Sequence, residues 1–251
     1  MSGVCCACRE EKEVFTLRKG VTKCAECICQ QIGRSTMDLF RKGLKNVPAP
    51  VHVLVVVTGD CSSVFASDLL RKRLNTSLQG KSAVVRKLDT VRKDSFEGEF
   101  TLPNIVKYAR ENDFNCIVLC DDASTVSLGT LAVISCGRPD LMHSLSCDDY
   151  KTYGMGVLRP VRQCLVEETE FYCRHHGLAF DNGYRTLDSV FIHEKRMIEE
   201  ILEDGHGDTV FAIQKLSERM PESSKQRKCP KCGLPYDQGD ECALCHMIHH
   251  Q

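Results

Sequence analysis

The sequence predicts an α/β fold: a mostly parallel sheet with helices on both faces, flanked by an N-terminal and a C-terminal zinc-binding cysteine cluster. From residue 51 to about residue 220, strand-like and helix-like segments alternate, which is typical of βαβ units. The run VHVLVVV at Val51–Val57 is continuously apolar, as expected of a strand that helices cover on both faces. Eight of the 17 cysteines form four CxxC pairs, two near each end of the chain.

The composition is that of a globular protein outside the membrane. A chain of 251 residues suits one domain of ordinary size with small appendages. The apolar run VHVLVVV stops at seven residues, far short of the roughly 18 that a membrane span needs. The start MSGVCCACREEKE lacks the apolar stretch of a secretory signal. We therefore expect a cytoplasmic protein, in which so many cysteines indicate metal or sulfur chemistry rather than disulfides.

The chain divides into three predicted parts. Residues 1–47 form an N-terminal zinc ribbon with a connecting helix, which ends at the linker VPAP. Residues 48–220 form the α/β domain, and residues 221–251 form a C-terminal zinc knuckle after a polar, linker-like stretch.

The elements follow from local pattern. Short apolar runs predict strands, small-residue turns precede helical patterns, and Leu102, Ile105, Val106 and Ala109 have the spacing of an amphipathic helix. The expected strands are 51–57, 82–88, 115–119 and 154–161, and the expected helices are 32–46, 62–78, the segment around 102–109, 124–135, and two or three within 166–219.

Two sets of four cysteines have the spacing of structural zinc sites. Zinc prefers four thiolates in a tetrahedron, and each CxxC turn presents two of them to one ion. The N-terminal set has the spacing x2, x15, x2, and the C-terminal set has x2, x9, x2. The predicted ligands are Cys5, Cys8, Cys24 and Cys27 in the first set, and Cys229, Cys232, Cys242 and Cys245 in the second.

The alternative for these pairs is redox chemistry, but redox CxxC pairs more often occur singly at a strand–helix junction. Cys6 and Cys29 lie beside the first set as spare or alternative ligands, and His246, His249 and His250 are expected to be solvated tail residues. With four thiolates, each ion has no open position, so its role is structural. Bound metal would supply most of the folding energy of segments this short.

The loop TGDCSS, residues 58–63, follows the first strand of the α/β domain. Thr58, Gly59, Ser62 and Ser63 are small enough to let a phosphate approach the amides at a helix N-terminus. Asp60 is not suited to this role, since its carboxylate repels phosphate. The loop is therefore either a nucleotide site or an ordinary turn in which Asp60 or Ser62 caps the helix.

A second acidic turn, LCDDAS at residues 119–124, follows another predicted strand. Because the carboxyl ends of parallel strands meet at one edge of a sheet, Asp121 and the TGDCSS loop are expected to share a crevice. For Asp122 we expect helix capping instead.

The loop, the acidic turn and the paired cysteine clusters together resemble the PP-loop ATPase family of tRNA sulfur-transfer enzymes. The family loop is Ser-Gly-Gly-x-Asp-Ser, with which residues 58–63 align without a gap; Asp60 replaces the second glycine and Ser62 replaces the aspartate. The stretches LCDDAST, SCGRPD and VLRPVRQCLVEETEFYCR resemble further family segments. The similarity is strongest to non-catalytic subunits of the cytosolic wobble-uridine thiolase.

The resemblance implies an adenine nucleotide alpha hydrolase-like fold and a role in 2-thiolating uridine 34 of cytosolic tRNAs for Lys, Glu and Gln. It implies a heterodimer with a catalytic PP-loop thiolase subunit that binds ATP and tRNA and takes sulfur from a thiocarboxylated ubiquitin-like carrier. The altered loop makes ATP a doubtful cofactor for this chain and leaves it without assigned catalytic residues. The positions that match the degenerate nucleotide loop and turn are Thr58, Gly59, Asp60, Ser62, Ser63 and Asp121.

Two other functions stay open at this point: a self-sufficient ATP-dependent tRNA thiolase, and a zinc-ribbon adaptor for RNA or protein without nucleotide binding. Cys61 and Cys120 follow strands at the presumed crevice, where a thiolate could carry sulfur, but buried inert thiols are the expected description.

Contact with tRNA would rest on local charge, because the formal net charge is −1. Arg159 and Arg162, near the presumed crevice, are predicted to contact RNA or the partner subunit. Two further groups of cations could contact phosphate: Arg34, Arg41, Lys42 and Lys45, and then Arg71, Lys72, Arg73, Lys81, Arg86, Lys87, Arg92 and Lys93.

Overall fold

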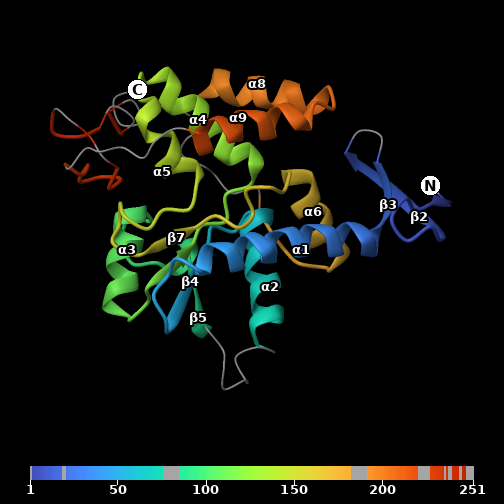
Figure 1. Ribbon diagram of the computed structural model, residues 1–251, viewed down its shortest axis with the longest axis horizontal. Helices are drawn as coiled ribbons and strands as arrows, with labels where there is room; N and C mark the ends of the chain where they lie inside the picture. Colours follow the sequence, from blue (N-terminus) through green and yellow to red (C-terminus); the bar gives the residue numbers. More distant parts are fainter. Residues whose placement is uncertain are drawn as a thin grey trace.

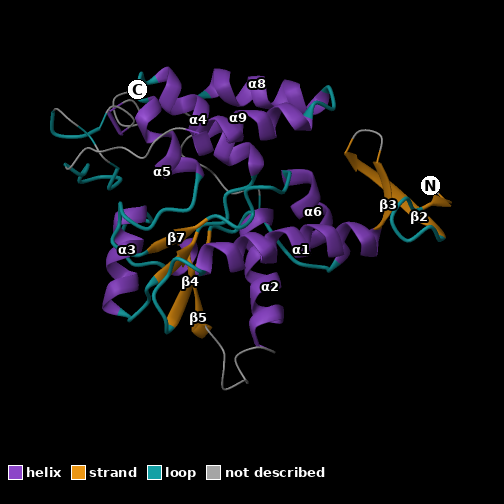
Figure 2. Cartoon of the chain, in the orientation of Figure 1, coloured by secondary structure: helices purple, strands orange, loops and turns teal. Residues whose placement is uncertain are grey.

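A four-stranded parallel sheet forms the centre of the protein, as predicted. The computed structural model describes residues 2–18, 21–75, 85–181, 191–219, 227–234, 236, 239–242 and 245–246. The strand order is β5-β4-β6-β7, and all three pairings are parallel (Figures 1 and 2). The strands are β4 (Val51–Val57), β5 (Val85–Arg92), β6 (Cys116–Val118) and β7 (Gly156–Leu158).

Helices cover both faces of this sheet. On one face, α1 (Ala25–Leu44), α2 (Cys61–Asn75) and α6 (Val166–His175) share a core with the odd-numbered valines of β4. On the other face, α3 (Leu102–Glu111) packs with Leu54 and Val56. Successive side chains of a strand point to opposite faces, so burial on both sides explains why β4 is apolar at nearly every position.

A further helical layer lies beyond the carboxyl ends of the strands (Figure 1). It contains α4 (Ala123–Ser135), α5 (Met142–Ser146), α8 (Ile192–Glu203) and α9 (Gly207–Arg219), together with the short 3-10 turn η2 (Pro139–Leu141) between α4 and α5. A second 3-10 turn, η1 (Lys93–Ser95), follows β5. Leu234 and Tyr236 of the C-terminal cysteine segment are buried in the core of this layer. The C-terminal segment is therefore packed against the body of the protein.

The N-terminal segment is a small antiparallel sheet of β1 (Ser2–Val4), β2 (Glu11–Arg18) and β3 (Val21–Cys24). It lies at one end of the molecule, and the described part of the C-terminal cysteine segment lies at the other (Figure 1). Phe15 meets Phe171 of α6 edge to face, with 4.8 Å between ring centroids. Arg18 donates two hydrogen bonds to the carboxylate of Glu168, at 2.7 and 2.8 Å.

Several predicted boundaries were wrong. The expected strand 82–88 is β5, which begins at Val85 and continues to Arg92, while 82–84 lie outside the described residues. As an edge strand, β5 tolerates the charged side chains that hid its second half. The helix expected at 32–46 begins at Ala25, and the strand expected at 154–161 is limited to Gly156–Leu158. The helix expected at 62–78 is α2, with 76–78 outside the described part.

Three helices, α6, α8 and α9, occupy the described part of 166–219, in agreement with the expected two or three. In the described part of the chain, no helix combines the length and the apolar character that a membrane crossing requires.

The Arg18–Glu168 pair predicts how firmly the N-terminal sheet is held. Glu168 is 5% exposed, and it also accepts a hydrogen bond from the amide of Leu165 at 2.9 Å. We expect Glu168→Gln to lower the free energy of unfolding by about 1–3 kcal/mol, because a charge-assisted pair is lost at a buried position. Urea denaturation of the metal-loaded chain measures this change.

The matched control is Glu170→Gln, two positions after Glu168 on α6. It removes an ion pair with the exposed Arg174. Exposed pairs contribute about 0–1 kcal/mol, so this change should be small. Equal effects of the two substitutions would show that the Arg18 contact does not fasten the sheet.

Candidate functional site

Asp60 is the N-cap of α2. One carboxylate oxygen, Oδ1, accepts a hydrogen bond from the amide of Ser63 at 2.8 Å, and the Asp60 carbonyl accepts one from the amide of Val64 at 3.0 Å. The other oxygen, Oδ2, accepts a hydrogen bond from the hydroxyl of Thr58 at 2.7 Å. The capping role that the sequence left as one of two possibilities is therefore present in the structure.

The TGDCSS loop uses its own donors internally. The amide of Gly59 donates to Ser63 Oγ at 3.1 Å, and Ser63 Oγ donates to the carbonyl of Asp60 at 3.0 Å. With the amide of Ser63 bound to Asp60, two amides that a phosphate would need are already engaged by the loop. In this conformation, the loop serves as a helix cap and not as a cradle for an anion.

A second carboxylate lies directly against the loop. The amide of Asp181 donates to the carbonyl of Gly59 at 3.0 Å, in a short parallel bridge between Asp60 and Asp181. Gly59 has φ of +98°, and a Cβ added there would lie 2.8 Å from Asp181 Oδ2. The carboxylates of Asp60 and Asp181 thus stand where the closest approach of a phosphate would be needed.

Ser62 connects the two predicted turns. Its hydroxyl donates to Asp122 Oδ2 at 2.8 Å and lies 3.0 Å from the hydroxyl of Thr169 on α6. Asp122 is itself the N-cap of α4, accepting from the amide and the hydroxyl of Thr125, both at 2.9 Å. The predictions that the two turns meet at one edge of the sheet and that Asp122 caps a helix are both confirmed.

Asp121, Arg159 and Arg162 belong to an internal ion-pair network. Arg159 Nε donates to Asp121 Oδ2 at 3.1 Å, and Arg162 Nη1 donates to Asp148 Oδ1 at 3.0 Å and to the carbonyl of Arg159 at 2.8 Å. The two arginines are only 2% and 7% exposed. In this conformation Arg159 joins the end of β7 to the turn after β6, Arg162 binds the segment before β7, and both side chains are buried.

The surroundings of Cys61 and Cys120 favour the protonated thiol over the thiolate. Burial raises the pKa of the Cys61 thiol, which lies 3.4 Å from the hydroxyl of Thr169. Burial also raises the pKa of the Cys120 thiol, which donates to the carbonyl of Val56 at 3.3 Å. Because only the thiolate is nucleophilic, both environments agree with the expectation of inert thiols.

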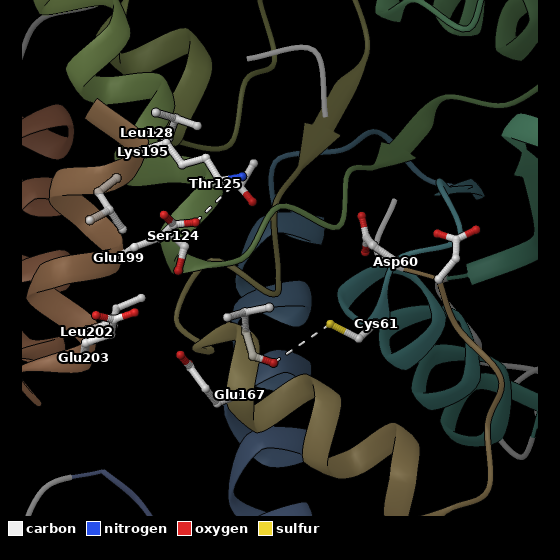
Figure 3. A pocket seen from close by; sticks show the side chains of 13 residues that line it. Asp60, Cys61, Ser124, Thr125, Leu128, Glu167, Lys195, Glu199, Leu202 and Glu203 are labelled. Carbon is white, nitrogen blue, oxygen red and sulfur yellow. Dashed lines mark hydrogen bonds and ion pairs between the residues drawn. The ribbon is translucent and has the colours of Figure 1, made fainter. Parts of the chain in front are cut away.

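A pocket of about 470 Å³ opens between the loop and α8 (Figure 3). Five carboxylates line it, and Lys195 is the one cation among its described lining residues, 3.7 Å from Glu199 in an ion pair. Burial raises the pKa of Glu167 within it. We call it the acidic pocket; its carboxylates are those of Asp60, Glu167, Asp181, Glu199 and Glu203.

Sequence reasoning identified only Asp60 among these five acids. Glu167 lies in α6, Glu199 and Glu203 lie in α8, and Asp181 follows α6, so they come from segments more than 100 residues beyond the loop. The spacing of Lys195, Glu199 and Glu203 on one helical face is visible in the sequence, but it is the ordinary pattern of a solvated helix.

Both cysteine groups are assembled as predicted. Within each group, the four Sγ atoms lie within 4.8 Å of one another. Cys8 and Cys24 are separated by 3.9 Å between sulfurs, and Cys232 and Cys242 by 3.5 Å. Four thiolates around one ion at about 2.3 Å stand about 3.8 Å apart, so both groups fit a single tetrahedral ion.

The same spacing fits a four-iron cluster poorly, because a cubane carries its thiolates on separate iron atoms and holds them farther apart. Amides support the sulfurs: Cys24 donates to Cys5 Sγ and Cys242 to Cys229 Sγ, each at 3.3 Å. His246 contacts Glu241 and is outside the four-residue group, while His249 and His250 lie outside the described residues.

No protein-family model matches the sequence, and no curated protein matches it by sequence. The solved structure of the U34-tRNA thiolase NcsA from Methanococcus maripaludis with its [4Fe-4S] cluster is similar, with a TM-score of 0.62. The match covers 90% of this chain and 92% of that one, at 11% sequence identity. The chain has the fold of this thiolase. The predicted PP-loop α/β fold is therefore confirmed over nearly its whole length.

A second solved structure, the NH3-dependent NAD synthetase from Campylobacter jejuni in complex with the nitrate ion, matches with a TM-score of 0.35 at 13% identity. This match covers 78% of the present chain and 99% of the synthetase chain.

The contact between Gly59 and Asp181 predicts a specific cost of substitution. Gly59→Ala should lower the free energy of unfolding more than Gly98→Ala does. Both glycines have positive φ, at +98° and +91°, but a Cβ on Gly98 meets nothing within 4 Å. The shared conformational cost is about 1–2 kcal/mol, so any excess at Gly59 reports the clash with Asp181.

Thermal and urea denaturation of the two variants measure this difference. The double substitution Gly59→Ala with Asp181→Ala should recover the excess cost, since it removes the atom that the new methyl group meets. Identical stabilities for the two single variants would rule out a tight Gly59–Asp181 contact.

Proposed function

We propose that this chain is the non-catalytic subunit of a complex that 2-thiolates the wobble uridine, position 34, of cytosolic tRNAs for Lys, Glu and Gln. In this proposal it is a counterpart of cytoplasmic tRNA 2-thiolation protein 2. The observation that carries the proposal is the combination of the U34-tRNA thiolase fold with a nucleotide loop that is closed on itself.

Electrostatics supports the non-catalytic role. The phosphates of ATP carry several negative charges, and the acidic pocket places five carboxylates against one lysine at the position of the loop. Two charges 4 Å apart interact by about 4 kcal/mol at the effective dielectric of a protein surface, so each unscreened carboxylate opposes a phosphate strongly. A site for ATP would need the opposite balance of charge.

The positions of the cysteines support the same role. NcsA is described with a [4Fe-4S] cluster. In the described part of the present chain, the groups of three or more metal-binding side chains are the two terminal sets, and neither lies at the crevice. With inert thiols at positions 61 and 120, this chain offers no evident carrier of sulfur at its loop.

The proposed complex divides the work between two subunits. The catalytic partner, cytoplasmic tRNA 2-thiolation protein 1 in this proposal, binds ATP and activates the uridine at C2. It takes sulfur from a thiocarboxylated ubiquitin-like carrier, while the present chain forms a heterodimer with it in the cytoplasm and helps to hold the tRNA.

An adaptor for RNA or protein without any nucleotide affinity is the second candidate, and the acidic pocket favours it over a self-sufficient thiolase. It differs from the main proposal in the fate of the tRNA. Loss of an adaptor that serves another process would leave wobble thiolation intact.

The metal in both cysteine groups is proposed to be zinc. The single-ion geometry and the all-thiolate donor sets suit it. Cys5, Cys8, Cys24 and Cys27 would then fold the N-terminal sheet onto the start of α1. Cys229, Cys232, Cys242 and Cys245 would keep Leu234 and Tyr236 in the core.

Wobble thiolation tests the proposed function directly. We expect 2-thiouridine at position 34, measured by mass spectrometry of digested tRNA, to fall strongly in cells that lack this protein. The variants Asp60→Asn and Cys120→Ser should restore the modification in these cells, because the proposal gives neither side chain a catalytic role. Calorimetry of the purified chain should show no binding of ATP. Unchanged 2-thiouridine in the deficient cells would refute the function, and ATP turnover by the isolated chain would favour a self-sufficient enzyme.

Metal analysis tests the two centres. Mass spectrometry of the metal content should find two zinc ions per chain without stoichiometric iron or acid-labile sulfide. Chelation should unfold the C-terminal segment and lower the thermal midpoint of the body, since that segment completes the core of α4 and α8. Cys232→Ser should halve the zinc content, and Cys6→Ser, outside the four-residue group, should leave it unchanged. Iron with sulfide in the native protein would overturn the assignment of zinc.

A further inference from the structure

The outer layer formed by α1 and α2 carries a concentration of exposed cations. We call it the basic face and define it by six exposed cations: Arg34, Arg41 and Lys42 on α1, Lys45 at its C-cap, and Lys72 and Arg73 on α2. Arg71 lines a separate depression against β5 and is not part of this face. The exposed acids on the same helices are Glu26, in the first turn of α1, and Asp38, which pairs with Arg41 at 3.3 Å. Asp68, which is partly buried, pairs with Lys72 at 2.8 Å.

The two helices pack against each other in the same layer. Both pack on the same face of the sheet, and they cross where Gly33 lies against Leu69; a Cβ on Gly33 would stand 3.3 Å from Leu69 Cδ1. Lys72 and Arg73 follow Leu69 by one turn of α2, so they lie beside this crossing. Arg34 is the residue next to Gly33, which brings the cations of the two helices to the same region.

The spacing along α1 is regular. Arg34, Arg41 and Lys45 are seven and four residues apart, which at 100° per residue keeps them within about 40° of one another around the helix. They span about 16 Å along its axis at 1.5 Å per residue. A row of cations of this length and straightness can follow several successive phosphates of a nucleic acid strand.

The basic face continues to the N-terminal cysteine group through an open depression of about 490 Å³. Its lining adds amide and hydroxyl groups to the cations, which are the side chains that accompany arginine and lysine at phosphates. These residues are Lys23, Gln30, Gln31, Arg34 and Ser35, together with Asp38.

We propose that the basic face and this depression bind the phosphodiester backbone of tRNA. The proposal rests on the proposed function and names the surface that would hold the RNA. In this proposal RNA binds away from the acidic pocket, whose charge repels phosphate. The chain would bind tRNA through the outer surface of α1 and α2, and the catalytic partner would act on the uridine.

The residues that are missing from this face decide between possible partners. The large exposed apolar side chains in the described part of the chain are Val4, Val21, Tyr108, Ile134, Ile192, Met197 and Leu216, and none lies on α1 or α2. A membrane-binding helix needs an apolar face to insert, so a lipid surface is not favoured. The aromatic rings of α1 and α2, Phe40 and Phe65, are buried and offer no surface on which a base could stack. Contact with the backbone is therefore expected to be independent of sequence.

Fluorescence anisotropy with a labelled tRNA transcript and the full zinc-loaded chain tests this surface. The variant Arg34→Gln/Arg41→Gln/Lys45→Gln should bind the transcript at least about tenfold more weakly, and the slope of log K against log salt should become shallower by about three. The control Lys107→Gln/Arg196→Gln/Arg219→Gln removes the same number of charges from exposed positions outside α1 and α2 and should bind as the wild type does. A hairpin RNA of unrelated sequence should lose affinity in the same proportion.

Wild-type affinity in the α1 variant, or equal losses in the variant and its control, would overturn the assignment. A membrane surface would instead be favoured if the α1 variant, compared with the wild type, kept its affinity for tRNA but lost binding to vesicles with about 30% anionic lipid. Wobble thiolation in cells reports separately on the proposed function. If deficient cells lose 2-thiouridine and the α1 variant both binds tRNA and restores the modification, the function stands and this face is wrong.

Discussion

The buried hydrogen bond from Ser62 to Asp122 holds the candidate site in its observed form. It joins the first turn of α2 to the first turn of α4, and the hydroxyl of Thr169 ties α6 to the same point. The Asp122 carboxylate is completely buried and needs this donor together with the amide and hydroxyl of Thr125. The loop of the resembling enzymes has an aspartate in place of Ser62. Two carboxylates within hydrogen-bond distance in a dry site cannot both be ionised. A serine at position 62 can donate a hydrogen bond to Asp122, whereas an aspartate there would repel it.

Charge is separated across the molecule. The carboxyl ends of the strands, where ligands bind in open parallel sheets, are surrounded by carboxylates, while cations gather on the outer α1–α2 layer. The net charge of −1 does not reveal this separation, since it is the balance of 33 basic and 34 acidic residues over the whole chain. The arrangement would direct an approaching polyanion away from the crevice and toward α1. A subunit that holds tRNA for a separate catalytic partner would benefit from such a field.

Local features were predictable from the sequence, and long-range ones were not. The CxxC pairs and the run Val51–Val57 specify their structures through spacing and burial alone, and the capping options for Asp60 and Asp122 follow from their position before a helix. Arg159 and Arg162 were expected to contact RNA or a partner. In the structure they are buried and paired with Asp121 and Asp148, an arrangement that depends on tertiary packing and cannot be predicted from local sequence. Asp181 contacts the loop, and Glu199 and Glu203 line the same pocket, only because the chain returns to this region after more than 100 residues. No local pattern encodes that encounter.

The residues of the TGDCSS loop form a coupled set of contacts. Glycine at position 60 would free the amide of Ser63 but remove the cap of α2, at a cost of a few tenths of a kcal/mol up to about 1 kcal/mol. It would still leave Asp181 against Gly59. Aspartate at position 62 would repel Asp122, whose carboxylate in turn caps α4. Each of these substitutions therefore removes a contact that the present fold uses, and neither removes the carboxylates contributed by α6 and α8. The backbone of the loop begins a helix, and its side chains join that helix to α4 and α6.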